Sequence, residues 1–186
     1  VVRRAVDWHA RGGIVTICRH TGPDFDSSYR ESQEKDLDWE KAFTPGTVEN
    51  HDLLAGMDRA VPYLQQLQRM NIPVLWRPFH EFDGKWFWWG RGGEEGFIRL
   101  WRLMYDRYTN HWGLNNLIWV LPYSGNGTAY GNWYPGDEYC DILAKYYANP
   151  TDMALLTQYT ELMTRAIEMD EAFAKWENED LNTEEL

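Results

Sequence analysis

Residues 72–90 read IPVLWRPFHEFDGKWFWWG, and this stretch places a strand directly before a set of reactive side chains. Its apolar start, residues 72–76, is short and follows a helical pattern, which predicts a buried strand. Arg77, His80 and Glu81 come immediately after that strand. Because ligands bind at the carboxyl ends of the strands in parallel α/β folds, these three side chains are candidate site residues.

Glu81 stands among large aromatic side chains. Trp86 and Trp89 follow it closely, and an apolar setting disfavours a charged carboxylate, which suits a group that must donate a proton. Trp86 offers a flat apolar face and an indole N–H, and both features suit a sugar ring. The alternative interpretation is that Glu81 forms a structural ion pair with Arg77, and that the aromatic side chains only fill a core.

Outward from this stretch, short apolar runs alternate with longer helical patterns. Strands are predicted at residues 13–18, 72–76, 117–121 (halted by Pro122) and 139–144. Helices are predicted at residues 53–70, 94–108 and 152–175, with Gly113 as a stop for the second and Pro62 either kinking the first or marking its true start. This alternation indicates a parallel sheet of βαβ units, either a (β/α)8 barrel or a doubly wound sheet.

The connections between these elements include two long polar segments. Residues 21–50 contain Pro23, Pro45 and Gly46 and are expected to form a long loop, which in a compact domain is usually functional. Residues 124–136 are rich in Gly and Asn and predict a second loop. The whole chain has 186 residues, enough for one domain but short for a barrel, which normally needs about 250.

Composition narrows the class of partner. The chain has 11 Trp, 11 Tyr and 7 Phe, which fits either sugar binding or ordinary core packing. Its net charge of −11 disfavours nucleic acid and anionic lipid surfaces. No apolar run reaches the roughly 18 residues of a membrane span, and no apolar signal core follows the first residues, so we expect no membrane association.

Cysteine and histidine residues show no spacing typical of a metal site. Cys18 ends one apolar run and Cys140 opens another, so two buried free thiols are expected, with a single disulfide as the alternative. We therefore expect neither a metal ion nor an organic cofactor.

Residues 76–90 resemble the signature of glycoside hydrolase family 26, the beta-mannanase family, in which Arg-Pro-Leu-His-Glu and a short turn lead to Trp-Phe-Trp-Trp-Gly. Supporting stretches lie at residues 12–16, 19–20, 91–93, 114–120 and 134–139, and the resemblance runs unbroken over about residues 5–145. It implies a (β/α)8 TIM barrel of the glycoside hydrolase type, here incomplete. It also implies an extracellular enzyme that hydrolyses β-1,4-mannans with retention of configuration.

The resemblance implies a role for each matching residue. Glu81 matches the family's general acid/base. The expected substrate-binding residues are His20, Arg77, His80, Trp86, Trp89, Tyr147 and Trp176. Retention also needs a second carboxylate, the nucleophile, about 5–5.5 Å from the first. The nearest candidate is Glu161, although its surroundings have helical spacing, so a position on a surface helix is the alternative.

The chain departs from the family pattern near its end. Lys145 stands where the family has Asp, two positions before Tyr147, and residues 146–186 are expected to be remodelled or partly deleted. We expect residues 1–186 to form a single catalytic domain, a retaining endo-acting hydrolase of mannan-type hemicellulose. The alternatives are a non-catalytic carbohydrate-binding remnant, and a hydrolase of the same family that acts on xylan or mixed-linkage β-glucan.

Overall fold

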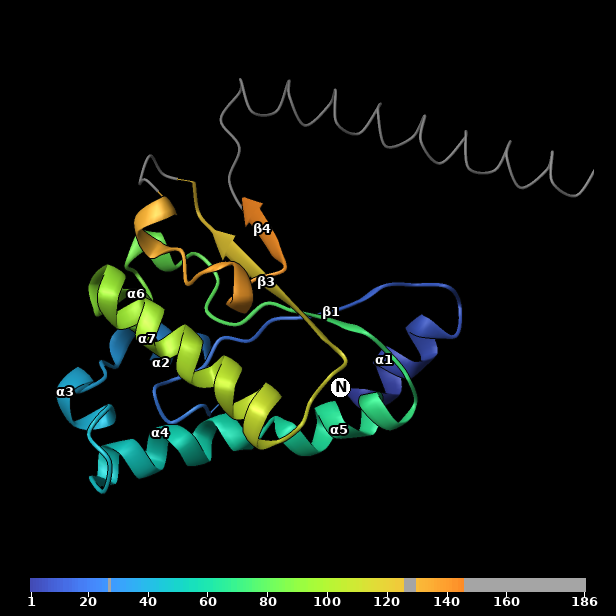
Figure 1. Ribbon diagram of the computed structural model, residues 1–186, viewed down its shortest axis with the longest axis horizontal. Helices are drawn as coiled ribbons and strands as arrows, with labels where there is room; N and C mark the ends of the chain where they lie inside the picture. The colour runs from blue at the N-terminus through green and yellow to red at the C-terminus, as the bar shows by residue number, and fades with distance from the viewer. Residues whose placement is uncertain (27, 126–129, 146–186) are drawn as a thin grey trace, which may run out of the picture. The chain divides into compact units, whose positions relative to one another are not determined.

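A four-stranded parallel sheet forms the centre of the computed structural model, which describes residues 1–26, 28–125 and 130–145. Its strands are β1 (Val15–Ile17), β2 (Val74–Trp76), β3 (Leu117–Tyr123) and β4 (Ile142–Lys145), in the order β1-β2-β3-β4 (Figure 1). The paired residues include Val15 with Val74, Val74 with Leu117, and Val120 with Ile142. The predicted parallel α/β class is therefore confirmed.

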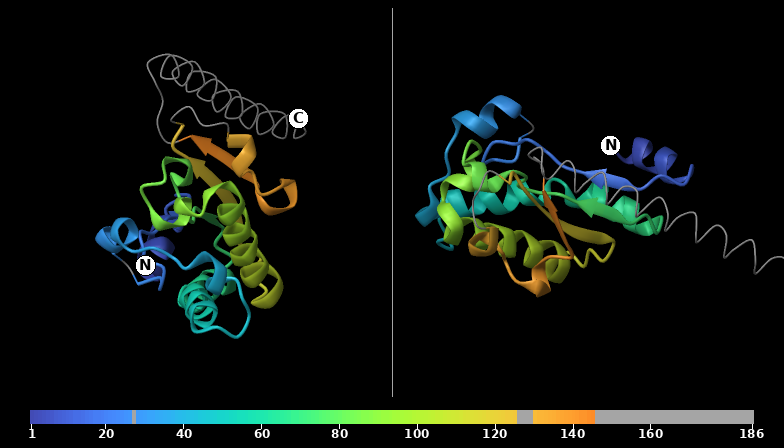
Figure 2. Two further views of the ribbon diagram at one scale, coloured as in Figure 1. Left: turned by 90° about the vertical axis from the view of Figure 1, so that its left-hand side faces the viewer. Right: turned by 90° about the horizontal axis from the view of Figure 1, so that it is seen from above.

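Helices fill the connections between the strands. In the described residues they are α1 (Val2–His9), α2 (Tyr29–Glu34), α3 (Trp39–Ala42), α4 (Val48–Asp58), α5 (Val61–Arg69), α6 (Trp88–Arg91) and α7 (Gly93–Asp106). A π turn at Arg107–His111 extends α7, and short 3-10 turns occupy Phe82–Gly84, Tyr130–Trp133 and Asp137–Tyr139. Helices α4 and α7 run alongside the sheet (Figures 1 and 2).

The main core lies between these helices and one face of the sheet. Trp76 of β2 and Trp119 of β3 are almost fully buried, and both rings contact Tyr108, at centroid distances of 5.8 and 6.2 Å. Burial of each such side chain stabilises the fold by roughly 1.5–3 kcal/mol. Because successive side chains of a strand alternate between faces, Leu75 and Ile118 point to the opposite face, where they are only partly buried.

The helix predicted at residues 53–70 is two helices. α4 ends at Asp58, and α5 begins at Val61 with Pro62 in its first turn. Proline lacks an N–H that the first turn does not use, so Pro62 marks a helix start rather than a kink. The predicted stop at Gly113 is confirmed, since this residue follows the π turn with a left-handed φ of 66°.

The prediction of one long loop over residues 21–50 was wrong, because α2, α3 and the start of α4 lie within it. Ser28 begins α2, and its side-chain oxygen accepts a hydrogen bond from the backbone N–H of Glu31 at 3.1 Å. Asp38 begins α3 in the same way, accepting from Lys41 at 3.1 Å. Such caps satisfy the first backbone donors of a helix, so short polar segments can form helices.

The ends of two strands also differ from the prediction. β3 continues through Pro122 to Tyr123, and Pro122 lies opposite Ala144 of β4. Proline has no N–H to donate, but it is tolerated here because its carbonyl group makes the hydrogen bond, accepting from the backbone N–H of Glu81. β4 begins only at Ile142, since residues 137–139 form a 3-10 turn.

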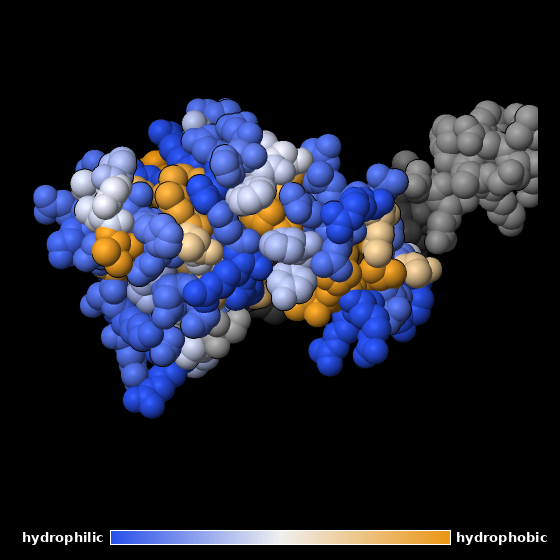
Figure 3. All heavy atoms as spheres, turned by 90° about the horizontal axis from the view of Figure 1, so that it is seen from below, coloured by the Kyte–Doolittle hydropathy of each residue, from blue (hydrophilic) through white to orange (hydrophobic). Residues whose placement is uncertain are grey.

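On the face that Figure 3 shows, the described residues are largely hydrophilic, with apolar patches between the hydrophilic regions. Exposed large apolar residues include Ile14, Val48 and Tyr63. Cys18 is exposed rather than buried as predicted, Cys140 is half-buried, and both are free thiols. No described helix has the length and apolar character that crossing a bilayer requires.

Candidate active site

The carboxyl ends of β1, β2 and β3 bring together side chains that are distant in the sequence. His20 follows β1 and His80 follows β2, and their Nε2 atoms are 3.0 Å apart. The backbone N–H of Glu81 donates to the carbonyl oxygen of Pro122 in β3 at 2.7 Å. The predicted site residues His20, His80 and Glu81 therefore lie together, as expected for the carboxyl edge of a parallel sheet.

Glu81 is buried, with 7% of its surface exposed. Its Oε2 accepts a hydrogen bond from the indole Nε1 of Trp86 at 2.9 Å. An indole donor supplies no charge, so it can orient the carboxyl group in either protonation state. Trp86 is half-buried, so the residue that holds this carboxyl group is partly accessible to solvent.

The backbone around Glu81 is held in an uncommon conformation. Phe79, Glu81 and Lys85 have φ angles of 55°, 53° and 60°, in the left-handed region that residues other than glycine rarely adopt. Each such residue costs on the order of 1–3 kcal/mol, so surrounding contacts must hold the turn. One contact needs a glycine, because a Cβ at Gly90 would lie 2.1 Å from the backbone oxygen of Phe82.

Two buried tryptophans, which follow this turn in the chain, hydrogen-bond to the segments that come after β1 and β2. The indole of Trp88 donates to the carbonyl of Thr21 at 2.7 Å, and the indole of Trp89 donates to the carbonyl of His80 at 2.8 Å. Both rings are almost fully buried, with 0% and 1% of their surface exposed. Trp89, predicted to bind substrate, is thus buried, and it contacts the site through the backbone carbonyl group of His80.

The two histidines form a neutral pair beside Glu81. Burial, together with the nearby charges of His20 and Arg77, lowers the pKa of His80 to about 4. Burial also lowers the pKa of His20, although Glu81 opposes that shift. Near neutral pH both imidazoles are therefore uncharged, and one Nε2 donates to the other. The Nδ1 of His80 is buried, so the half-buried His20 is the member of the pair that can offer a ring nitrogen to a hydroxyl group.

Arg77 occupies the end of β2, where its backbone N–H donates to the carbonyl of Ile17 at 2.9 Å. Its guanidinium is close enough to lower the pKa of His80. The Trp86 indole contacts the Glu81 carboxyl group directly. An ion pair with Arg77 is therefore not needed to explain how Glu81 is oriented.

Asp83 belongs to this site and was not identified from the sequence. Its side chain is buried, with 6% exposed. Oδ1 accepts from the backbone N–H of Ser124 at 2.6 Å, and Oδ2 accepts from the Ser124 hydroxyl at 2.8 Å and from the N–H of Gly125 at 3.2 Å. These bonds join residues 79–85, which we call the Glu81 turn, to the end of β3.

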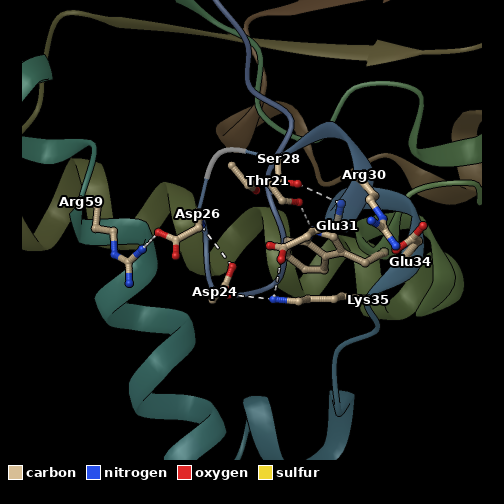
Figure 4. A network of polar contacts seen from close by, with 10 residues as sticks. Thr21, Asp24, Asp26, Ser28, Arg30, Glu31, Glu34, Lys35 and Arg59 are labelled. Carbon is tan, nitrogen blue, oxygen red and sulfur yellow. Dashed lines mark hydrogen bonds and ion pairs between the residues drawn. The ribbon is translucent and has the colours of Figure 1, made fainter.

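The loop that carries His20 is held by a network of polar side chains (Figure 4). Lys35 pairs with Asp24 at 3.2 Å and with Glu31 at 3.1 Å. Asp26 forms an ion pair with Arg59, the C-terminal cap of α4. These groups are largely exposed, so solvent and salt screen each pair and its contribution to stability is small. Together they tie the loop to α2 and α4.

Three of the predicted site residues, Tyr147, Glu161 and Trp176, lie outside the described residues. Among the residues that the structure does describe, no group of three or more His, Cys, Asp or Glu side chains could hold a metal ion. The assembled groups are a buried carboxyl group, a neutral imidazole pair and a partly open indole. They can exchange a proton beside a flat apolar surface.

Comparison with known proteins matches residues 1–182 to the model of Glycosyl hydrolase family 26. A mannan endo-1,4-beta-mannosidase of Thermothelomyces thermophilus is 36% identical over 157 residues, which is 84% of this chain and 31% of the relative. Mannan endo-1,4-beta-mannosidase A and B of Caldalkalibacillus mannanilyticus is 33% identical over 187 residues, covering 91% of this chain and 34% of the relative.

Solved structures give the same result. A beta-mannanase from a symbiotic protist of the termite Reticulitermes speratus, complexed with gluco-manno-oligosaccharide, superposes with a TM-score of 0.73 at 32% identity. That match covers 88% of this chain and 53% of the other. The chain therefore spans about half the length of this solved relative and about a third of the curated ones. The expected barrel-type α/β fold is confirmed by this likeness.

Proposed function

The chain belongs to glycosyl hydrolase family 26, and from that premise we propose that its strand-end site binds β-1,4-mannan and cleaves it. The observation that carries the proposal is Glu81, a buried carboxyl group oriented by the half-open Trp86 indole at the carboxyl ends of parallel strands. Relatives named as mannan endo-1,4-beta-mannosidases support the same substrate class.

In the proposed reaction, Glu81 gives its proton to the glycosidic oxygen as the bond to the anomeric carbon breaks. A second carboxylate attacks that carbon, and Glu81 then takes a proton from the water that releases the sugar. Glu161 remains our candidate for the second carboxylate. Asp83 is a poor candidate, because both of its oxygens already accept hydrogen bonds from Ser124 and Gly125.

The other groups would place the sugar. The half-buried Trp86 ring is a platform for a mannose face, and His20, paired with the buried His80, lies in the same site to bond a hydroxyl group. Arg77 lies beside His80, and the indole of Trp89 holds His80 in place by a hydrogen bond to its backbone carbonyl group. Tyr147 and Trp176 remain proposed substrate contacts.

We further propose that residues 1–186 belong to a single catalytic domain and that the protein acts outside the cell, where mannan is found. Retention of configuration and endo-acting cleavage belong to the same proposal. A hydrolase of xylan or mixed-linkage β-glucan, or a carbohydrate-binding remnant without turnover, would share the platform and differ in the reaction.

The test compares reducing-end release from mannan, xylan and mixed-linkage glucan by the chain, by Glu81→Gln and by Glu138→Gln, a control at an exposed carboxyl group. We expect turnover of mannan, a loss of about 100-fold or more in Glu81→Gln, and no loss in the control. Binding of mannan without turnover would favour the remnant. If the chain neither binds nor cleaves mannan, that result contradicts the proposal.

A further inference from the structure

We propose that Asp83 is a positioning residue that sets the orientation of Glu81 by fixing the Glu81 turn to the end of β3. The function of this contact rests on the proposed role of Glu81, whereas the contact itself does not. Asp83 carries a buried carboxyl group two positions after Glu81, and no step of the proposed reaction uses it.

The first observation is how Asp83 is bonded. Its two oxygens accept from three donors, the N–H and hydroxyl of Ser124 and the N–H of Gly125, at 2.6, 2.8 and 3.2 Å. A buried carboxylate that accepts several hydrogen bonds is strongly held, because removing it leaves buried donors without an acceptor. The side chain therefore acts as a rigid link between two segments that are 41 positions apart.

The second observation is where this link lies. β2 ends at Trp76, but β3 continues to Tyr123, so on that side the end of β3 pairs with no strand of the described residues. The Glu81 turn takes that place, with the N–H of Glu81 on the carbonyl of Pro122 at 2.7 Å. Asp83 supplies the next attachment along the chain, so the turn is bound to β3 on both sides of Phe82.

The third observation is that the turn needs holding. Glu81 itself has a left-handed φ of 53°, and Lys85 has one of 60°. A turn with such backbone angles is expected to relax when an attachment is lost. Relaxation would move the Glu81 carboxyl group away from the Trp86 indole, whose hydrogen bond of 2.9 Å reports on the geometry.

The experiment follows the indole N–H signals of Trp86 and Trp112 by NMR in the full chain, each assigned by its Trp→Phe variant. Trp112 is a matched reporter, because its indole donates at 2.8 Å to Asp58, a second carboxyl group that also holds Arg107. We expect Asp83→Ala to move the Trp86 signal upfield, as Glu81→Ala does, and to leave Trp112 in place. Asp58→Ala should do the reverse.

A Trp86 signal that stays in place in Asp83→Ala, while it moves in Glu81→Ala, would overturn the proposal. Should Asp83→Ala fail to fold, Ser124→Ala decides instead, since it removes only the hydroxyl donor. It should move the Trp86 signal in the same direction by a smaller amount, and an unmoved signal would again overturn the proposal. If the signals behave as expected but mannan is not cleaved, the proposed function fails and the positioning role stands.

Discussion

At the scale of single residues, burial makes His80 a poor base. Its pKa falls from 6.5 to about 4 in the folded chain because the imidazole is desolvated and because His20 and Arg77 lie near it. The unfolded chain therefore takes up a proton near pH 6.5 that the folded chain refuses. The stability that results is fully present above about pH 6.5 and is lost as the pH falls towards about 4.

This linkage gives a measurable slope in a plot of the free energy of unfolding against pH. Between about pH 6.5 and about pH 5, His80 should lower the free energy of unfolding by about 1.5 kcal/mol, as measured by urea denaturation. In His80→Gln that part of the slope should disappear. His111→Gln, a change at an exposed imidazole, should keep it. An unchanged slope in His80→Gln would show that folding does not lower the pKa of His80.

Residue patterns predict the site only where its members are close together in the chain. Glu81 stands out because a strand and several aromatic residues surround it within one short stretch. Asp83 does not stand out, since its role depends on hydrogen bonds from Ser124 and Gly125. Those residues come close to Asp83 only because β2 pairs with β3. The role of Trp89 as a buried support likewise depends on which way the turn faces.

At the scale of elements, the turn between β2 and α7 depends on close contact between backbone segments. Gly90→Ala would place a Cβ 2.1 Å from the oxygen of Phe82, which is too close for any side-chain atom. We expect it to lower the free energy of unfolding by about 3 kcal/mol or more. The matched control is Gly131→Ala, where nothing lies within 4 Å and a change of less than about 1 kcal/mol is expected.

Urea denaturation of both glycine variants checks this prediction, and equal stability in the two would contradict the packing described for the turn.

Some of the elements can be predicted from the sequence and others cannot. β1, β2 and β3 follow from short apolar runs, and α5 follows from Pro62. The helices α2 and α3 were missed because their signal is a capping side chain, at Ser28 and Asp38, rather than an apolar stripe.

At the scale of the whole molecule, the alternation of strand and helix patterns predicted the parallel sheet, and the family resemblance over about residues 5–145 predicted its barrel-type fold. An incomplete barrel is also expected to expose sheet edges, and the structure shows which strand does so. Among the described residues β4 pairs only with β3, and its Ile142 and Leu143 are 41% and 44% exposed. An unpaired strand with exposed apolar side chains is a template for pairing with another chain.

We therefore expect the chain to associate at high concentration, and Ile142→Lys to reduce that association, because a charge on an edge strand opposes pairing. Val48→Lys is the control, since Val48 is also apolar and is more exposed than Ile142, at 72% against 41%, but begins α4. Sedimentation velocity over a range of concentrations measures both. A chain that stays monomeric throughout would contradict the expectation, as would equal behaviour of the two variants.

The central claim is that Glu81 donates a proton to a glycosidic bond, and a comparison of two leaving groups tests it most directly. Glu81→Ala is assayed on mannan, whose leaving sugar needs a proton, and on an activated aryl β-mannoside, whose leaving group does not. The account predicts a loss of about 100- to 10,000-fold on mannan, with the first release of the aryl group nearly unchanged. Equal losses on both substrates, or full activity on mannan, would contradict it.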